Sequence, residues 1–350
     1  MPPIRCAIVG VGNCASALVQ GVHLSAGSVE GGGGGKPEAE GKLLCGVAYP
    51  LISGYAPSDL IFVCAWDVDL RKVGLSLNQA IFAPPNCCFL IDPTTKDTPS
   101  KVLVRKGPVL DGVAPHMLTA PHGFRVSDEQ RPDTQAEVVA ALRAARVDVL
   151  INYLPVGSTQ AAHFYASCCL EAKVSLCNCI PVFIASDRAW EQRFRDAGLP
   201  LIGDDMKSQF GSSIVSQILQ ECAFARGVKV ESHVQQNSGG NTDFLNMSDK
   251  TRLVSKKISK ENVLRGSLPP SSAFLHAGPS DYISHLGDTK IAHISLIGEG
   301  FGGAPITFHG RLEVEDSPNS AGVVIDAVRF LQAARDLGIS GSLRGASAFT

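Results

Sequence analysis

The sequence predicts an α/β protein with a doubly wound parallel sheet and a second, α+β domain inserted before the C-terminal helix. Three observations predict this fold. An apolar run over residues 4–9 ends in a glycine turn and is followed by helix-forming residues. Short apolar runs then alternate with amphipathic helices as far as Gly227, as they do in a parallel sheet. Beyond Gly227 the apolar runs are longer and alternate with period two, which is typical of strands covered on one face.

The length and composition set the class of protein. A chain of 350 residues with 45% hydrophobic and 18% charged residues is typical of a globular protein, and its length favours two domains. The net charge of −2 gives no basis for binding nucleic acid or a membrane surface. We therefore expect neither nucleic acid nor a membrane as a partner.

The cysteines and the apolar runs indicate a compartment. The 11 cysteines are odd in number and include no Cys-x-x-Cys spacing, so they indicate reduced thiols and a cytoplasmic location. A zinc site at Cys177 and Cys179 is disfavoured by their close spacing, and we expect no metal-ligand cluster. No run of 18 apolar residues predicts a membrane-spanning helix, and the glycines at 10 and 12 disfavour a secretory signal over residues 4–19.

The glycine turn Gly10-x-Gly12-x-x-Ala15 fits a relaxed dinucleotide fingerprint. The first glycine permits the tight turn, and the second allows backbone N–H groups to approach a pyrophosphate at the start of the next helix. Asn13 and Cys14 complete the turn. With a strand before it and a helix at 15–23 after it, the motif predicts a Rossmann domain; a glycine turn that binds nothing is the alternative.

Asp67 closes the next predicted strand, which begins at residue 60. A carboxylate at this position accepts hydrogen bonds from ribose hydroxyls, which favours NAD over NADP. Asp67 lies further from the glycine turn than is usual, because residues 27–57 intervene and include five consecutive glycines at 31–35. That composition predicts a flexible surface insertion.

The middle of the chain predicts the rest of the parallel sheet. Thr134 and Glu137 have the spacing of a capping box at the start of a helix. Strands are expected at 147–153, 174–177 and 199–202, and helices at 158–172 and 212–226. The NAD-binding domain is therefore predicted to comprise residues 1–208 together with 317–350, where a helix at 320–337 packs back on the sheet.

Residues 209–316 are predicted to form the second domain. Its strands are expected at 228–236, 291–297 and 306–314 and suit an antiparallel sheet. In the last of these strands, Ile306, Phe308, Leu312 and Val314 face one way while polar residues face the other.

Four lysines could bind an anionic substrate. Lys256 and Lys260 are four residues apart, so on a helix they share a face, where an anion between them would relieve their repulsion. Lys207 follows a predicted strand end, and Lys290 follows Asp288 closely. Taken singly, each is better explained as an exposed lysine, so their role depends on whether the fold brings them together.

Seven segments resemble the myo-inositol-1-phosphate synthase family in its shorter prokaryotic-type form. They follow the family's order and extend over essentially the whole sequence, and the last three are specific to the family. The segments are VGVGNCASALVQG at 9–21, YLPVGS at 153–158, PVFIAS at 181–186, GDDMKS at 203–208, GGNTDFLN at 239–246, SKKISK at 255–260 and DSPNSAG at 316–322.

The resemblance implies an isomerase of inositol and phospholipid biosynthesis that converts D-glucose 6-phosphate to 1D-myo-inositol 3-phosphate. In that reaction NAD oxidises C5 of the open-chain sugar, loss of a C6 proton gives an enolate, the enolate closes on the C1 aldehyde, and NADH returns the hydride. Such chemistry needs cations where negative charge develops and cations that hold a phosphate, and lysines supply both.

The resemblance also implies roles for particular residues. It places Lys256 at the oxygen being oxidised, and Lys207, Lys260 and Lys290 around the phosphate and the enolate. Ser76 stands where related actinobacterial members have an aspartate. The residues that would contact the cofactor or orient the lysines are Gly10, Gly12, Asn13, Cys14, Ala15, Asp67, Ser76, Ala145, Tyr165, Asp205, Ser208, Asn241, Asp243, Asp288 and Asp316.

The resemblance further implies a divalent or monovalent cation and a homotetramer formed through the sheet of the second domain. The family carries another active-site lysine shortly after the segment that matches residues 345–350, and this sequence ends before it. Two alternatives therefore stay open. One is an NAD-dependent dehydrogenase of the homoserine or semialdehyde type, which would release NADH, and the other is a non-catalytic NAD-binding homologue.

Overall fold

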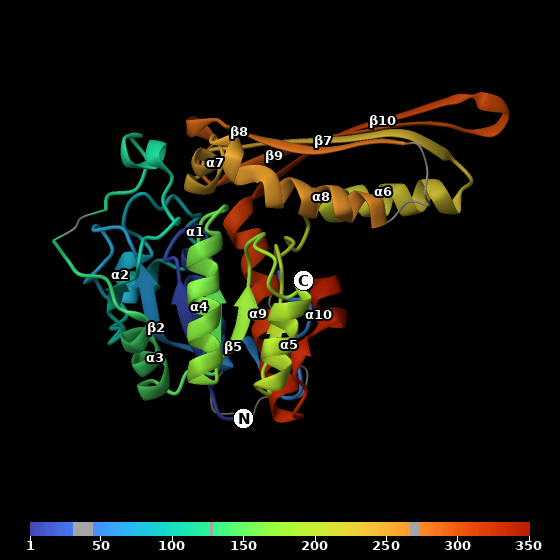
Figure 1. Ribbon diagram of the computed structural model, residues 1–350. Helices are drawn as coiled ribbons and strands as arrows, with labels where there is room; N and C mark the ends of the chain where they lie inside the picture. Colours follow the sequence, from blue (N-terminus) through green and yellow to red (C-terminus); the bar gives the residue numbers. More distant parts are fainter. Residues whose placement is uncertain (31–44, 127–128, 267–272) are drawn as a thin grey trace.

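The computed structural model describes residues 1–30, 45–126, 129–266 and 273–350, and it confirms the doubly wound α/β fold (Figure 1). One sheet has seven strands in the order β11-β6-β5-β4-β1-β2-β3, and every neighbouring pair is parallel. Its strands are β1 (Ile4–Val9), β2 (Leu60–Asp67), β3 (Val104–Lys106), β4 (Val149–Asn152), β5 (Ser175–Asn178), β6 (Pro200–Ile202) and β11 (Gly341–Ser342). The strand order reverses between β1 and β4, where ligands bind in such folds.

Helices cover both faces of the parallel sheet. On one face lie α3 (Gln135–Ala144), α4 (Thr159–Ala172) and α5 (Arg188–Asp196), whose apolar sides join one buried core (Figure 1). On the other face lie α1 (Asn13–Glu30) and α9 (Asp316–Asp336), which share a second core. The short helices α2 (Leu77–Ala80) and α10 (Arg344–Phe349) lie at the margins. The predicted packing of the C-terminal helix on the first domain is confirmed.

The predicted capping box begins α3. Thr134 donates its N–H to Oε2 of Glu137 at 2.8 Å, and Glu137 donates its N–H to Oγ1 of Thr134 at 3.4 Å. These reciprocal bonds satisfy two of the N–H groups that the start of a helix leaves without a partner. The helix therefore begins where the sequence predicted.

The prediction of a flexible insertion at 27–57 was wrong for the residues that the structure describes. Helix α1 continues through residue 30, and Val47 and Tyr55 are buried in the core between α1 and α9. The fully buried Arg329 of α9 donates to the carbonyl oxygens of Tyr49, Pro50 and Tyr55. Buried carbonyl groups need such donors, so a single arginine ties this segment to the core. The five consecutive glycines lie outside the described residues.

A second sheet has the strand order β10-β9-β7-β8. Its strands are β7 (Lys229–Gly239), β8 (Phe274–Tyr282), β9 (Thr289–Glu299) and β10 (Pro305–Glu315). Helices α6 (Ser212–Ala225) and α8 (Val254–Gly266) cover the face nearer the first domain, and α7 (Thr242–Asn246) lies at one end (Figure 1). All four strands fall within residues 209–316, whereas the strands of the first sheet come from 1–208 and 317–350.

The second sheet is mixed, not antiparallel as predicted. Strands β7, β9 and β10 are antiparallel neighbours, but the unpredicted strand β8 pairs in parallel with β7. The reason is the segment of α7 and α8 between them, which returns the chain so that β8 begins beside the start of β7. Parallel neighbours need such a crossover.

The register of β10 agrees with its predicted alternation. Phe308 pairs with Leu296 and Leu312 pairs with Ala292, so the apolar side chains of β10 share the face of the buried side chains of β9. Phe308 is nevertheless 38% exposed, because the β9–β10 hairpin projects at its tip past the helices (Figure 1). Within the described ranges, no helix carries an apolar stretch long enough to cross a membrane.

Candidate active site

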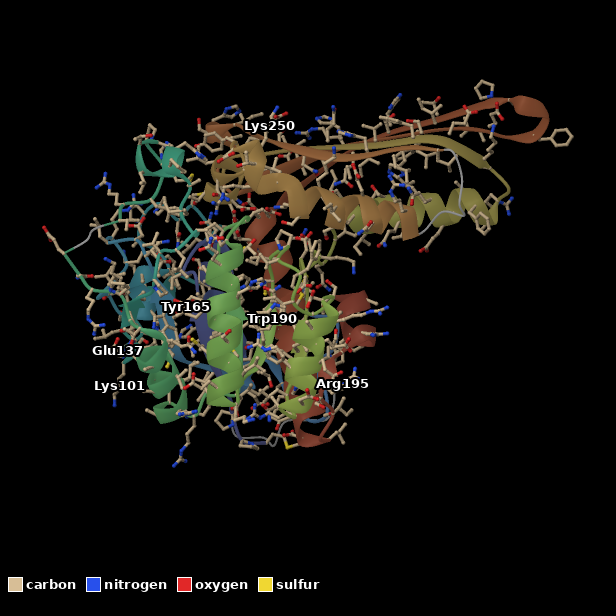
Figure 2. All side chains as sticks on the ribbon, in the orientation of Figure 1. Lys101, Glu137, Tyr165, Trp190, Arg195 and Lys250 are labelled. Carbon is tan, nitrogen blue, oxygen red and sulfur yellow. The ribbon has the colours of Figure 1, made fainter. Side chains whose placement is uncertain are left out.

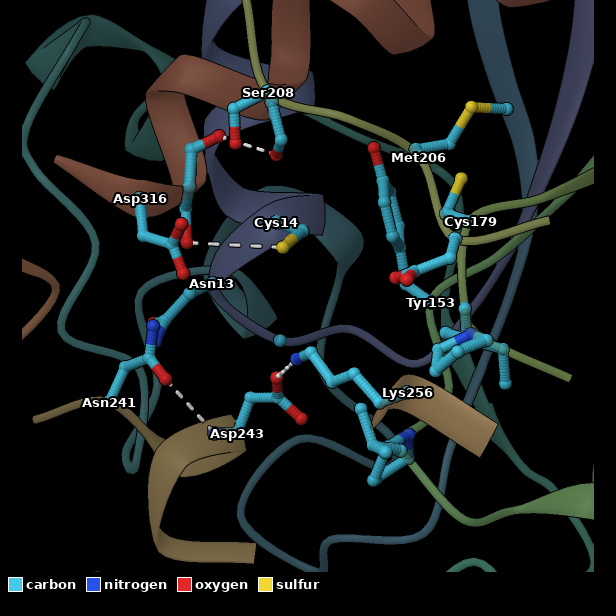
Figure 3. Close-up of a pocket in the computed structure, with 18 of the residues that line it drawn as sticks. Asn13, Cys14, Tyr153, Cys179, Met206, Ser208, Asn241, Asp243, Lys256 and Asp316 are labelled. Carbon is cyan, nitrogen blue, oxygen red and sulfur yellow. Dashed lines mark hydrogen bonds and ion pairs between the residues drawn. The ribbon is translucent and has the colours of Figure 1, made fainter. Parts of the chain in front are cut away.

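A cavity of about 310 Å³ lies between the carboxyl ends of the parallel strands and the second domain (Figure 3). Its position at the reversal of strand order and between two domains is where ligands bind in this class of fold. The lining side chains that bear on its chemistry are those of Asn13, Cys14, Lys72, Asn86, Tyr153, Asp205, Lys207, Ser208, Asn241, Asp243, Lys256, Ser259, Lys260, Lys290, Asp316 and Ser317.

The glycine turn between β1 and α1 forms one wall. Gly10 has a φ of +88°, and an added Cβ would lie 2.5 Å from the carbonyl oxygen of Tyr153, so only glycine fits there. At Gly12 an added Cβ would meet nothing within 4 Å, and the residue lines the cavity. Ala15 is fully buried behind the turn. The open space at Gly12 and the start of α1 suit a phosphate.

Asp67 lies behind the turn and does not line the cavity. Its Oδ2 accepts the N–H of Val11 at 2.7 Å, and its Oδ1 accepts the N–H groups of Val68 and Asp69 at 2.7 and 2.8 Å. A carboxylate can accept about four hydrogen bonds, so capacity for a ribose hydroxyl is left. The ribose contact of Asp67 stays a prediction.

Two lysines enter the cavity as ion pairs. The Nζ of Lys256 lies 3.0 Å from Oδ2 of Asp243 (Figure 3), and the Nζ of Lys290 lies 3.0 Å from Oδ1 of Asp316. Burial opposes the charge of Lys256, but Asp243 and Asp205 outweigh it and raise its pKa. Burial likewise opposes the charge of Asp316, but Lys290 holds the pKa of this carboxyl below its usual value. The charged forms of Lys256 and Asp316 are therefore favoured.

Lys260 differs from these paired lysines. It lies one turn after Lys256 on α8, and the two share a face of the helix that lines the cavity, as their spacing predicted. Among the described carboxylates, none lies within 4.0 Å of its Nζ. Burial, with the positive charges of Lys290 and Lys256, lowers the pKa of Lys260 to about 7. A lysine with such a pKa can both take up and release a proton near neutral pH.

Lys207 reaches the cavity from the segment after β6. Its Nζ donates to the carbonyl oxygen of Ala348 at 2.8 Å, and its backbone N–H donates to the carbonyl oxygen of Thr350 at 2.6 Å. Burial lowers the pKa of Lys207. The structure thus brings Lys207, Lys256, Lys260 and Lys290 to one cavity from three separate parts of the chain.

The segment that carries Lys207 is held by a half-buried carboxylate. Asp204 accepts a hydrogen bond from Nδ2 of Asn178 at 2.6 Å and from the backbone N–H groups of Ile184, Ala185 and Ser186 at 3.0 to 3.1 Å. The next residue, Asp205, has a left-handed φ of 58° and lines the cavity. A left-handed backbone conformation at a residue other than glycine is strained and persists only where the surrounding contacts enforce it. Such residues are common at functional sites.

A buried hydrogen-bond chain orients Asp243. Asp288 accepts hydrogen bonds at 2.9 Å from Nδ2 of Asn241 and from Oγ of Ser317. The Oδ1 of Asn241 in turn accepts the backbone N–H of Asp243 at 3.1 Å and caps α7. Asp288 is only 3% exposed and does not line the cavity, and burial raises its pKa to about 7. It supports the site from behind.

Ala145, Tyr165 and Ser76, like Asp67 and Asp288, lie outside the lining of the cavity. Ala145 caps α3, and its carbonyl oxygen accepts Nε of Arg5 at 2.6 Å, at the start of β1 and so at the opposite end of the sheet. That placement contradicts a cofactor contact. Tyr165 lies midway along α4 (Figure 2). It is 2% exposed, and its ring packs on that of Trp66. Ser76 lies at the N-cap of α2, outside the cavity lining.

Several lining residues were not singled out from the sequence, among them Lys72, Asn86 and Tyr153. Lys72 and Asn86 lie in the loops that follow β2, where no periodic pattern predicts the course of the chain. Tyr153 belongs to a quoted motif, and its place at the end of a predicted strand was the signal that could have found it.

A glycine turn at the reversal of a doubly wound sheet, facing a cavity lined by five lysines, defines a dinucleotide-binding enzyme for an anionic substrate. The model of the myo-inositol-1-phosphate synthase family matches residues 211–317. The inositol-3-phosphate synthase of Mycolicibacterium smegmatis is 43% identical over 352 residues, which cover 99% of this chain and 92% of that protein. The chain therefore belongs to the myo-inositol-1-phosphate synthase family.

Two further comparisons agree. The inositol-3-phosphate synthase of Corynebacterium glutamicum is 41% identical over 354 residues, covering 99% of this chain and 92% of that protein. The crystal structure of Ari2 superposes with a TM-score of 0.78 at 34% identity, covering 99% of this chain and 91% of that one. Family membership favours the synthase over the homoserine or semialdehyde dehydrogenase alternative.

Asp288→Asn tests the buried carboxyl group behind the cavity. The pKa of Asp288 is about 7 in the folded protein, above the usual unfolded value of about 3.9, so the unfolded chain releases the proton first. This carboxyl group therefore costs stability as the pH rises from about 4 to about 7. We expect the free energy of unfolding of the wild type to fall, relative to that of Asp288→Asn, between about pH 5 and about pH 7 in urea titrations.

The matched control is Asp249→Asn, because hydrogen bonds from Thr251 lower the pKa of Asp249 and its titration falls below this range. The difference between the wild type and this control should not change with pH. Parallel curves for the wild type and Asp288→Asn would show that the Asp288 carboxyl group has an ordinary pKa.

Proposed function

We propose that this protein is an inositol-3-phosphate synthase that isomerises D-glucose 6-phosphate to 1D-myo-inositol 3-phosphate with bound NAD. The observation that carries the proposal is the convergence of Lys207, Lys256, Lys260 and Lys290 beside the glycine turn in a member of this family. A dehydrogenase site needs cations only where its substrate binds, whereas a cyclisation must also stabilise an enolate and a phosphate.

The residues of the turn fit a dinucleotide. Gly12, Asn13 and Cys14 line the cavity at the start of α1, and they would hold the pyrophosphate through backbone N–H groups. Asp67, hydrogen-bonded to the same turn, would accept the ribose hydroxyls. When bound, NAD accepts a hydride from C5 of the sugar and returns it in the last step.

The paired lysines would stabilise negative charge. Asp243 keeps Lys256 protonated, so its ammonium group would donate a hydrogen bond to the oxygen at C5 as that carbon is oxidised and later reduced. Lys290, paired with Asp316, would hold the phosphate or the enolate oxygen. Lys207, which also lines the cavity, would contribute a further ammonium group to bind the phosphate or the enolate.

Lys260 would transfer the proton. Removal of a C6 proton requires a base that is partly neutral at the working pH, and the pKa of Lys260 is about 7. The neutral amine would take up the C6 proton, and the ammonium group that results would give a proton to the C1 oxygen as the ring closes and that oxygen becomes a hydroxyl group. Burial and repulsion by Lys290 and Lys256 lower the pKa of Lys260, and this lower pKa suits Lys260 to remove the C6 proton.

A conversion assay tests the proposed function. With NAD and D-glucose 6-phosphate, we expect inositol phosphate by phosphorus NMR and no net change in nicotinamide absorbance. The family resemblance implies a cation but does not say which, and the described ranges hold no group of three His, Cys, Asp or Glu residues that could bind a metal ion. Parallel reactions would therefore contain either a divalent or a monovalent cation. Accumulating NADH would indicate a dehydrogenase, and NAD binding without product would indicate a non-catalytic homologue.

Lys256→Ala should retain NAD binding and lose turnover. Removal of one preorganised donor from a developing oxyanion costs about 10²–10³-fold in kcat. The matched control is Lys257→Ala on the same helix, whose side chain is 57% exposed and lies 3.8 Å from Glu261. Equal kcat values for the two variants would remove Lys256 from the mechanism.

We also propose that the protein is a cytoplasmic homotetramer formed through the second domain; its 11 free thiols support a reducing compartment. Helix α6 buries the polar side chains of Ser212, Ser216 and Gln220 against the sheet and exposes Ile218 and Phe224, which are 54% and 62% exposed. A helix with its apolar side chains outward supports contact with another subunit.

Sedimentation equilibrium should give about four times the chain mass of 36.9 kDa. Ile218→Lys with Phe224→Lys should lower the assembly state, because burying two charges without partners is costly. Leu118→Lys, at a residue of the first domain that is 56% exposed, is the control and should stay tetrameric. A wild-type monomer would contradict the proposed assembly.

A further inference from the structure

Lys72 is a buried cation that the proposed reaction does not use. It follows β2 and is 2% exposed, yet it lines the cavity. Its Nζ donates to the carbonyl oxygen of Val11 and to Oδ1 of Asn86, both at 2.8 Å, and lies 4.0 Å from Oδ2 of Asp67. Burial lowers the pKa of Lys72, while Asp67 and Asp69 oppose that effect. Burying a lysine is costly, so its place beside the glycine turn needs an explanation.

The central residue of the glycine turn is held from both sides. The N–H of Val11 donates to Asp67 at 2.7 Å, and its carbonyl oxygen accepts both Nζ of Lys72 and Nδ2 of Asn86, the latter at 3.1 Å. In a planar trans peptide the carbonyl group and the following N–H point in opposite directions. Lys72 and Asn86 therefore fix the direction of the N–H of Gly12, for which no described residue supplies an acceptor.

Charge favours the same conclusion. Among the described residues that line the cavity, the cationic side chains are Lys72 and the four lysines of the substrate site. A pyrophosphate carries two negative charges, and the start of α1 offers only a partial positive charge. Lys72 is the cation that lies with the glycine turn and not with the substrate lysines.

We infer that Lys72 is a determinant of dinucleotide binding: with Asn86 it fixes the Gly12 N–H toward the pyrophosphate, and its ammonium group balances the phosphate charge. This inference rests on the proposed cofactor site. A lysine that only held the shape of the turn would change the affinity of every ligand of the site equally. A lysine that contributes its charge changes the affinity of ligands that carry phosphates and leaves the affinity of the others unchanged.

The test compares adenosine, ADP and NAD as ligands by isothermal titration calorimetry. Lys72→Gln keeps an N–H donor for the Val11 carbonyl oxygen but removes the charge. We expect it to bind ADP and NAD about 10–100-fold more weakly, the worth of a charged hydrogen bond, and adenosine within about 3-fold of the wild type. The dependence of ADP binding on salt should weaken as well.

Two further variants complete the design. Lys72→Arg keeps the charge and should bind ADP more tightly than Lys72→Gln, which covers the case in which the glutamine variant folds poorly. Lys101→Met removes an exposed lysine of the same domain and should change nothing. Equal weakening of adenosine and ADP, or unchanged ADP binding, would overturn the inference. Because binding needs no turnover, a wild type that binds ADP but makes no product would contradict the proposed function alone.

Discussion

Two ion pairs determine what the cavity can do. Each joins a lysine to a carboxylate at 3.0 Å, Lys256 to Asp243 and Lys290 to Asp316. Without such partners, several ammonium groups could not stay charged together in a cavity shielded from water. Burial, together with the positive charges of Lys290 and Lys256, drives Lys260 toward its neutral form. Lysine side chains in one site thus serve two purposes: Lys256 keeps its positive charge, and Lys260 can take up and release a proton.

The fold supplies these pairs by joining the two domains at the cavity. Asp316 is the first residue of α9, which continues into the core beside α1, so the carboxylate that holds Lys290 is anchored in the NAD-binding domain. Asp243 follows the cap of α7, whose Asn241 is bound to the buried Asp288. The chain leaves the first domain after β6 and returns through α9, and both crossings lie beside the glycine turn. Insertion of the second domain before the C-terminal helix is therefore what closes the site.

The sequence predicted the elements whose signals are local. The glycine turn, the capping box of Thr134 and the alternation of β10 were read correctly, because each depends on residues close together in the chain. Convergence of the four lysines could not be derived from spacing, since they come from separate segments, and only the family resemblance suggested it. Two inferences were misleading. The glycine-rich composition of 27–57 concealed the buried side chains of Val47 and Tyr55, and transfer by position assigned Ala145 to the cofactor although it lies at the far end of the sheet. Lys72 gave no signal at all, as a single lysine in a loop.

The measurement that tests the electrostatic basis of this site most directly is the titration of Lys260 by NMR of its ε-carbon, with Lys260→Arg used to assign the resonance. We predict a midpoint near the pKa of about 7, and a higher midpoint in Lys256→Met, because that substitution removes one of the positive charges that repel the proton. A midpoint near the ordinary lysine value of about 10.4 in the wild type would contradict the role of Lys260 as the group that carries the proton.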